Sequence, residues 1–131
     1  MTDIVAAGLG CRKGCGADEI VALVRTAMEK AGLSMDMLSG LFAPAFKHAE
    51  TGVSEAARAL GVPLVLIPEP SMKAAEPRAV TKSERVVALI GLASIAETAA
   101  LAGAGLTSRL VQPRIASRNA TCAIAAGGDR P

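Results

Sequence analysis

The sequence predicts an α/β fold: a single three-layer domain with a mostly parallel central sheet flanked by helices. Apolar runs of strand length alternate with helical patterns, an order that requires parallel strands joined by right-handed crossovers. A length of 131 residues suits one domain with one substantial core, so we expect residues 1–131 to fold as a unit. Hydrophobic residues make up 51% of the chain, with two Phe and no Trp or Tyr, so the expected core is aliphatic.

The N-terminal region predicts a strand, a glycine loop and a helix. Residues 4–10 are apolar and end in glycines, as expected of a buried strand that runs into the tight loop 8–16. Apolar residues then recur at the spacing of one helix face over 20–31. Gly32 is the natural end of this helix.

The next segments continue the alternation of strands and helices. Residues 37–42 form a short apolar run typical of a strand. A helix is expected over 51–60, because its apolar residues also fall on one face. Residues 62–67 predict a third buried strand, with a proline near its start, where a missing amide donor matters least.

The middle of the chain changes in composition. Residues 68–82 are rich in Pro, Glu, Lys and Arg, and Pro70 and Pro77 interrupt any long element. We therefore expect an exposed loop with at most one helical turn. The segment 83–89 that follows suits a short helix or a strand.

The C-terminal segments predict one more helix and two closing strands. The helix is expected over 94–101, with glycines shortly after it. The apolar patterns of 109–112 and 120–126 predict the strands, and 127–131 should be a frayed tail.

Composition and charge exclude several classes of protein. Fourteen Lys and Arg against twelve Asp and Glu give a net charge of +2, far from the concentrated basic footprint of a nucleic-acid binder. No run approaches about 18 apolar residues, and the start lacks a signal-peptide pattern, so we expect no membrane segment. Three cysteines, an odd number, fit a reducing compartment. The sequence thus predicts a cytoplasmic protein.

Basic residues are nevertheless unevenly distributed. Arg109, Arg114, Arg118 and Arg130 crowd the C-terminal quarter, where Asp129 is the only acidic residue. Such a patch could bind a polyanionic small molecule. A solvated strand edge guarded by arginines is the more common reason for this pattern, and both interpretations stay open.

The glycine loop is the motif with the clearest mechanism. Gly8, Gly10 and Gly14 would let backbone amides approach an anion at the start of the following helix. A plain structural turn explains the same glycines. The dinucleotide fingerprint fails because its third glycine comes one residue late, and no Gly-Lys-Ser/Thr follows for a P-loop. We therefore expect no nucleotide or other cofactor.

The cysteines give a weak metal signal. Cys11 and Cys15 could join His48 or Cys122 around a metal, but the paired spacing of structural zinc sites is missing. Cys122 lies in an apolar strand pattern, where a buried thiol acts as a small hydrophobe. We expect no metal site.

Two polar clusters are candidates for binding or catalysis. Lys47 and Glu50 follow a strand end, where Lys47 could bind a substrate carboxylate and Glu50 could act as acid or base; a surface ion pair explains them equally. Ser94 and Glu97 have the spacing of a capping box. Residues 91–94 could also offer free amides to a second anion.

Several segments in order resemble one known family. They are Gly-Leu-Gly-Cys-Arg-Lys-Gly at 8–14, the pair 46–50 and 60–64, the stretch 83–101, and the ending at 110–125. Together they resemble the CobE family, the stand-alone counterpart of the CbiG C-terminal domain. Two positions depart from the family pattern, because Arg114 stands where the family has Lys and Ala45 where it often has Asp.

The resemblance implies a protein of cobalamin (vitamin B12) biosynthesis, which builds the corrin ring. It implies that the chain binds a precorrin or corrinoid intermediate, as a carrier or accessory protein of the oxygen-dependent route. Two alternatives stay open. One is a hydrolase of the CbiG type that opens a precorrin lactone, with Glu50 or Glu97 activating water. The other is a subunit that supports another enzyme of the pathway and binds no ligand.

Precorrins carry many acetate and propionate side chains, so cationic and amide-rich positions are the candidate site. A homodimer is compatible with the mean hydropathy of +0.41, although an aliphatic core gives the same value. The candidate catalytic residues are Glu50 and Glu97, and the candidate ligand-binding residues are Gly8, Gly10, Cys11, Arg12, Lys13, Gly14, Lys47, Ser83, Gly91, Ser94 and Arg114.

Overall fold

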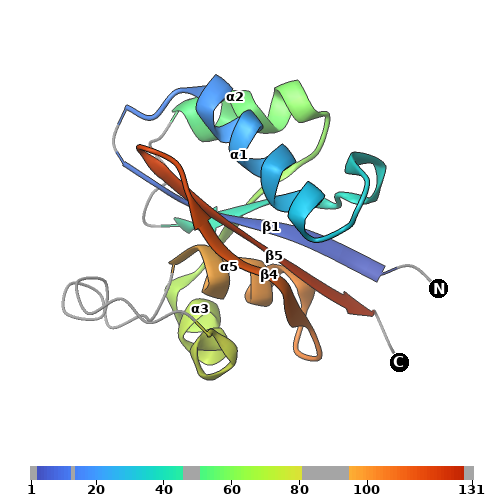
Figure 1. The fold of residues 1–131 in the computed structure, drawn as a ribbon. Coiled ribbons are helices and arrows are strands. Elements are labelled where there is room, and N and C mark those ends of the chain that lie inside the picture. The colour runs from blue at the N-terminus through green and yellow to red at the C-terminus, as the bar shows by residue number, and fades with distance from the viewer. Residues whose placement is uncertain (1–2, 13, 46–50, 81–94, 129–131) are drawn as a thin grey trace.

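The computed structural model describes residues 3–12, 14–45, 51–80 and 95–128 (Figure 1). Helices and strands alternate along the first part of the chain, and two strands close it. In chain order the elements are β1 (Asp3–Cys11), α1 (Ala17–Lys30), a 3-10 turn (Met35–Met37), β2 (Gly40–Pro44), α2 (Thr51–Leu60), β3 (Leu64–Ile67), α3 (Glu69–Ala75), a second 3-10 turn (Glu76–Arg78), α5 (Ile95–Ala104), β4 (Arg109–Ala116) and β5 (Ala120–Gly128).

The described strands form one mixed sheet in the order β3-β2-β1-β5-β4. β1, β2 and β3 are parallel, whereas β5 runs antiparallel to both of its neighbours. The prediction of a mostly parallel sheet is therefore wrong. Only residues 117–119 join β4 to β5, and so short a connection permits a hairpin but no crossover.

The three layers are confirmed. In Figure 1, α1 and α2 cover one face of the sheet, and α3 and α5 cover the other. On the first face, Leu9 and Leu41 pack with Ile20 and Met28 of α1. On the second face, smaller side chains such as Ala6 and Ala123 pack against α5. This arrangement follows from right-handed crossovers, which place α1 and α2 on the same side of the parallel strands.

α5 lies unusually close to the sheet because glycines leave room for it. A Cβ atom on Gly8 would stand 2.0 Å from the carbonyl oxygen of Ala96, and one on Gly103 would stand 2.4 Å from the ring of Phe42. Seven of the ten residues of α5 are buried and none is exposed, so the helix is enclosed on all sides rather than amphipathic. Gly8, one of the expected ligand-binding residues, thus has a packing role in β1.

The helix α3 corrects the expected loop over 68–82. The prediction was that Pro70 interrupts any helix. In the structure Pro70 lies in the first turn of α3, where a proline costs no hydrogen bond. Pro77 occupies the same kind of position in the second 3-10 turn. Met72 and Ala75 of α3 are buried against the α5 face, so this segment belongs to the core.

The helices α1 and α2 match their expected positions, and Gly32 and Gly61 end them with φ values of +76° and +73°. β2 begins at Gly40, after a 3-10 turn that takes up the start of the expected strand. β5 runs on to Gly128, past the expected start of the tail. The segments 83–89 and 129–131 lie outside the described residues. Among the helices that the structure describes, none is long and apolar enough to cross a membrane.

Candidate functional site

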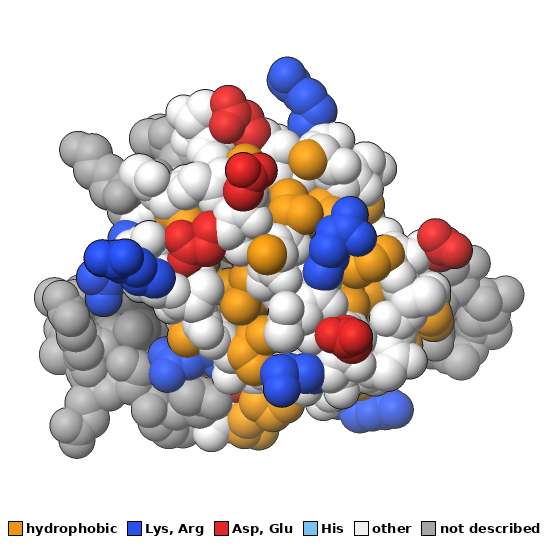
Figure 2. Space-filling model, turned by 45° about the horizontal axis from the view of Figure 1, so that its top comes forward, with side chains coloured by type: hydrophobic (Ala, Val, Ile, Leu, Met, Phe, Trp, Pro, Cys, Tyr) orange, Lys and Arg blue, Asp and Glu red, His pale blue; other side chains and the backbone are white. Residues whose placement is uncertain are grey.

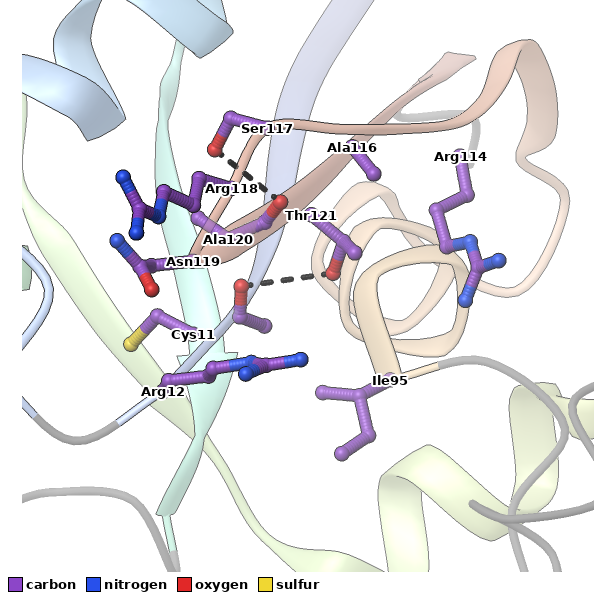
Figure 3. Close-up of a pocket in the computed structure, with 11 residues that line it drawn as sticks. Cys11, Arg12, Ile95, Arg114, Ala116, Ser117, Arg118, Asn119, Ala120 and Thr121 are labelled. Carbon is purple, nitrogen blue, oxygen red and sulfur yellow. Dashed lines mark hydrogen bonds between the residues drawn. The ribbon is translucent and has the colours of Figure 1, made fainter.

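A cleft of about 310 Å³ opens where β1 ends, next to the β4–β5 hairpin and the start of α5. The carboxyl end of β1 contributes its floor, the hairpin tip one wall, and Ile95 the other (Figure 3). We call it the arginine cleft. Its described lining comprises Gly10, Cys11, Arg12, Ile95, Arg114, Ala116, Ser117, Arg118, Asn119, Ala120 and Thr121.

Three guanidinium groups line the arginine cleft, those of Arg12, Arg114 and Arg118, and the described lining includes no Asp or Glu. In Figure 3, Arg12 and Arg114 extend toward Ile95 from two sides, while Arg118 turns outward beside Asn119. The face covered by α1 and α2 differs from the cleft in its charges, because acidic and basic side chains are interspersed there (Figure 2). The cleft is therefore suited to a ligand with several negative charges.

Backbone pairing holds Arg12 at the base of the cleft. β1 pairs with β5 up to Cys11, and the Arg12 amide then donates to the carbonyl of Asn119 at 2.8 Å. The Thr121 hydroxyl donates to the carbonyl of Gly10 at 3.4 Å. A Cβ on Gly10 would come within 2.8 Å of that hydroxyl oxygen, so the glycine leaves room for the Thr121 side chain here.

Glu19 of α1 anchors the tip of the hairpin. Its carboxylate accepts hydrogen bonds from the Ser117 hydroxyl, from the Asn119 amide at 2.7 Å and from the Asn119 side chain at 3.0 Å. The bond from Ser117, followed by those from Asn119, lowers the pKa of Glu19 from its ordinary value of 4.5 to about 2. The carboxylate thus stays charged and fixes the wall that carries Arg118.

Glu97 of α5 anchors the same hairpin from the opposite face. The side chain is fully buried. One carboxylate oxygen accepts the backbone N–H of Val80, and the other accepts the backbone N–H of Arg114, each at 2.9 Å. These bonds hold the backbone of β4 at the position from which the Arg114 side chain enters the cleft. Ser94, the expected capping partner of Glu97, lies outside the described residues.

The structure brings together four of the predicted binding residues, namely Gly10, Cys11, Arg12 and Arg114. Gly14 instead forms an exposed turn at φ +82°, with open space where a side chain would be, and does not line the cleft. Gly8 packs against α5 and Glu97 supports β4, and neither lines the cleft. The other predicted site residues lie outside the described part of the chain: Lys13, Lys47, Glu50, Ser83, Gly91 and Ser94.

The hairpin tip is the part of the cleft that the site prediction missed. Ser117, Arg118, Asn119 and Thr121 line it, and Ile95 faces them from α5. The crowding of arginines near the C-terminus was the available signal, since two of those arginines reach the cleft. The turn itself carries no motif that indicates a ligand.

The three cysteines differ in burial. Cys11 is half-buried in the cleft, whereas Cys15 and Cys122 are buried. Burial raises the pKa of the Cys122 thiol to about 12, which keeps it protonated and unreactive. Among the described residues, no three His, Cys, Asp or Glu side chains gather closely enough to hold a metal.

Comparisons with known proteins point in one direction. The profile of the family described as Cobalamin synthesis G C-terminus matches residues 5–125. Protein CobE of a Sinorhizobium species is 33% identical over 118 residues, which cover 90% of this chain and 77% of that protein.

Two crystal structures share the fold. One is that of CobE, a protein from the cobalamin biosynthetic pathway, with a TM-score of 0.89 and 28% identity, covering 100% of this chain and 95% of that one. The other is cobalamin biosynthesis protein chiG from Agrobacterium tumefaciens, with a TM-score of 0.76 and 36% identity, covering 96% of this chain and 100% of that one.

Proposed function

The chain belongs to the cobalamin synthesis G C-terminal family, which includes CobE, and on that premise we propose that it binds a precorrin or corrinoid intermediate in the arginine cleft. Membership of the family makes it a CobE-like protein of cobalamin biosynthesis. The proposed role is that of a carrier or accessory protein in the oxygen-dependent route. Other enzymes of the pathway would receive the ligand from it.

The observation that carries the proposal is the set of three arginines around one cleft without an acidic residue in its described lining. Precorrins carry acetate and propionate side chains, so the ligand is a polycarboxylate. A guanidinium binds a carboxylate through two parallel hydrogen bonds, and it remains charged at any physiological pH. Arg114 supports this geometry better than the lysine expected from the family pattern.

Binding is favoured over hydrolysis because the described lining of the cleft offers no carboxylate or imidazole to activate water. Both oxygens of Glu97 already accept backbone amides, and the side chain is fully buried. Glu50, the other candidate base, lies outside the described residues. A hydrolase of the CbiG type thus remains the alternative, and it has no described general base to support it.

A titration with hydrogenobyrinic acid, followed by the visible absorption of the ligand, tests the proposal. We expect a dissociation constant in the micromolar range or below for the wild type. Arg114→Gln should weaken binding by about tenfold or more, because a charge-assisted pair is lost. Arg109→Gln is the matched control, since Arg109 lies on the same strand but does not line the cleft.

Mass spectrometry of the ligand after incubation separates the alternatives. An unchanged mass is expected for a carrier, whereas a time-dependent change would favour the hydrolase. If no corrinoid or precorrin binds, the proposal is wrong and the chain is better described as a subunit that supports another enzyme.

A further inference from the structure

The arginine cleft is small for a tetrapyrrole-derived ligand. Its volume of about 310 Å³ lies at the lower end of the roughly 300–1,000 Å³ that small-molecule sites usually span. Such sites normally enclose most of their ligand. A macrocycle with all its side chains needs far more room, so only a part of it fits between the described walls.

The chemistry of the lining indicates which part that is. The cleft offers guanidinium groups, two hydroxyls and one amide, but Ile95 is its only large aliphatic side chain among the described residues. A ring plane needs a broad apolar wall or an aromatic side chain to lie against. Phe42, the one aromatic side chain among the described residues, is buried in the core under α5 and cannot supply one, and Phe46 lies outside the described residues. The described walls therefore match polar substituents better than a ring.

The arginines are arranged for neighbouring anions. Arg12 comes from the end of β1 and Arg114 from β4, and in Figure 3 their side chains extend toward Ile95 from different sides. Two adjacent carboxylates would each meet one guanidinium, with the short apolar stem between them over Ile95. Arg118 lies farther out, beside Asn119, where it can meet a third charge.

We propose that the arginine cleft recognises the carboxylate rim of its ligand and that the ring plane lies outside the described walls of the cleft. This inference rests on the proposed function, because it specifies which part of the intermediate the same site holds. None of the described lining residues then covers the centre of the ring, where a second protein would act on the ligand before it is released.

Three ligands with separable features test the inference on the full chain. Hydrogenobyrinic acid has the corrin-type ring and the carboxylate rim. Its fully amidated form keeps the ring and removes the rim charges. Uroporphyrin keeps acetate and propionate side chains on a different ring. Dissociation constants are measured by absorption or fluorescence titration for the wild type, Arg12→Gln, Arg114→Gln and the control Arg109→Gln.

Recognition of the rim predicts that uroporphyrin binds within about tenfold of hydrogenobyrinic acid and that the amidated form binds at least about a hundredfold more weakly. Arg12→Gln and Arg114→Gln should weaken both carboxylate ligands by similar factors. Equal binding of the acid and its amidated form, with no binding of uroporphyrin, would overturn the inference while the proposed function stands. No binding of hydrogenobyrinic acid at all would overturn both.

Discussion

The two faces of the sheet are packed with different kinds of side chain. The face under α1 and α2 uses large side chains such as Leu9, Ile20, Met28 and Leu41, which belong to one buried cluster. The face under α5 is built mainly of Ala and Gly, and the helix backbone nearly touches β1 at Gly8. At Gly8 the backbone of α5 itself meets the sheet, so changes of side-chain rotamer cannot relieve a clash there.

This difference matters for the arginine cleft, which lies where the two faces meet. α5 contributes Ile95 to the cleft and Glu97 to the support of Arg114, so its close packing fixes both. α1 contributes Glu19, which holds the hairpin tip from a half-buried position. We therefore expect substitutions on the α5 side to cost more stability than equivalent ones on the α1 side.

The largest effect is expected for Gly8→Ala. The new methyl group would meet the Ala96 carbonyl and the Ala100 backbone, which cannot move aside, so we expect a loss of at least about 3 kcal/mol in the free energy of unfolding. Gly16→Ala is the control, because Gly16 has a φ of −80° and a Cβ atom added there would meet no atom within 4 Å. Its change should stay within about 1 kcal/mol. Urea denaturation measures both, and similar losses would contradict the close backbone contact at Gly8.

The next largest losses of stability are expected when the anchoring carboxylates of Glu97 and Glu19 are removed. Glu97→Ala removes a fully buried carboxylate and leaves the amides of Val80 and Arg114 without this acceptor, so we expect it to cost about 3 kcal/mol in the free energy of unfolding. Glu19→Ala should cost less, because water reaches the hairpin tip. Thermal and urea unfolding of both variants test the order. A greater loss for Glu19→Ala would show that the hairpin depends mainly on the α1 side.

The Glu19 anchor should make the free energy of unfolding depend on pH. The pKa of Glu19 is about 2 in the folded protein and near 4.5 in the unfolded chain, so the unfolded chain takes up the proton first. Its contribution to stability is complete above about pH 5 and is lost as the pH falls toward 2. In urea titrations between pH 6 and 2, Glu19→Gln should be less stable than the wild type at pH 6, and this difference should shrink steadily on acidification. A constant difference would argue against the anchor.

Chemical labelling of the cysteines should leave stability unchanged before it reaches the core, and it reports directly on the cleft. Cys122 and Cys15 are buried, and Cys11 is half-buried in the cleft lining. A thiol reagent should therefore label Cys11 first in the native protein at pH 8. Saturating hydrogenobyrinic acid should slow that labelling about tenfold or more, as followed by mass spectrometry. Equal labelling with and without the ligand would place its binding elsewhere.

The first part of the fold was predictable because its signals are local. The spacing of apolar residues identified α1 and α2, and Gly32 marked the end of α1. The helix α3 was missed because Pro70 has opposite meanings in a first turn and in a helix interior, and only the position of the helix start decides between them. The antiparallel half of the sheet was missed for a related reason, since the two closing strands were identified without the direction that their short connection imposes.

The candidate site was predictable only where it follows a strand. The strand pattern at the end of β1 indicated Gly10, Cys11 and Arg12, and the resemblance to the family indicated Arg114. All four line the cleft, and their binding of a ligand stays a prediction. The contact between Glu19 and Asn119 joins residues a hundred positions apart, and no local pattern indicates such a pair. Arg118 belonged to the arginine-rich segment, but its place in the cleft depends on that long-range anchor.

A crystal structure of the complex with hydrogenobyrinic acid tests the central claim most directly. We expect carboxylate oxygens of the ligand about 2.7–2.9 Å from guanidinium nitrogens of Arg12 and Arg114, with the ring plane projecting beyond Ile95. A ligand whose ring lies flat against another surface, with its carboxylates far from both arginines, would contradict the account.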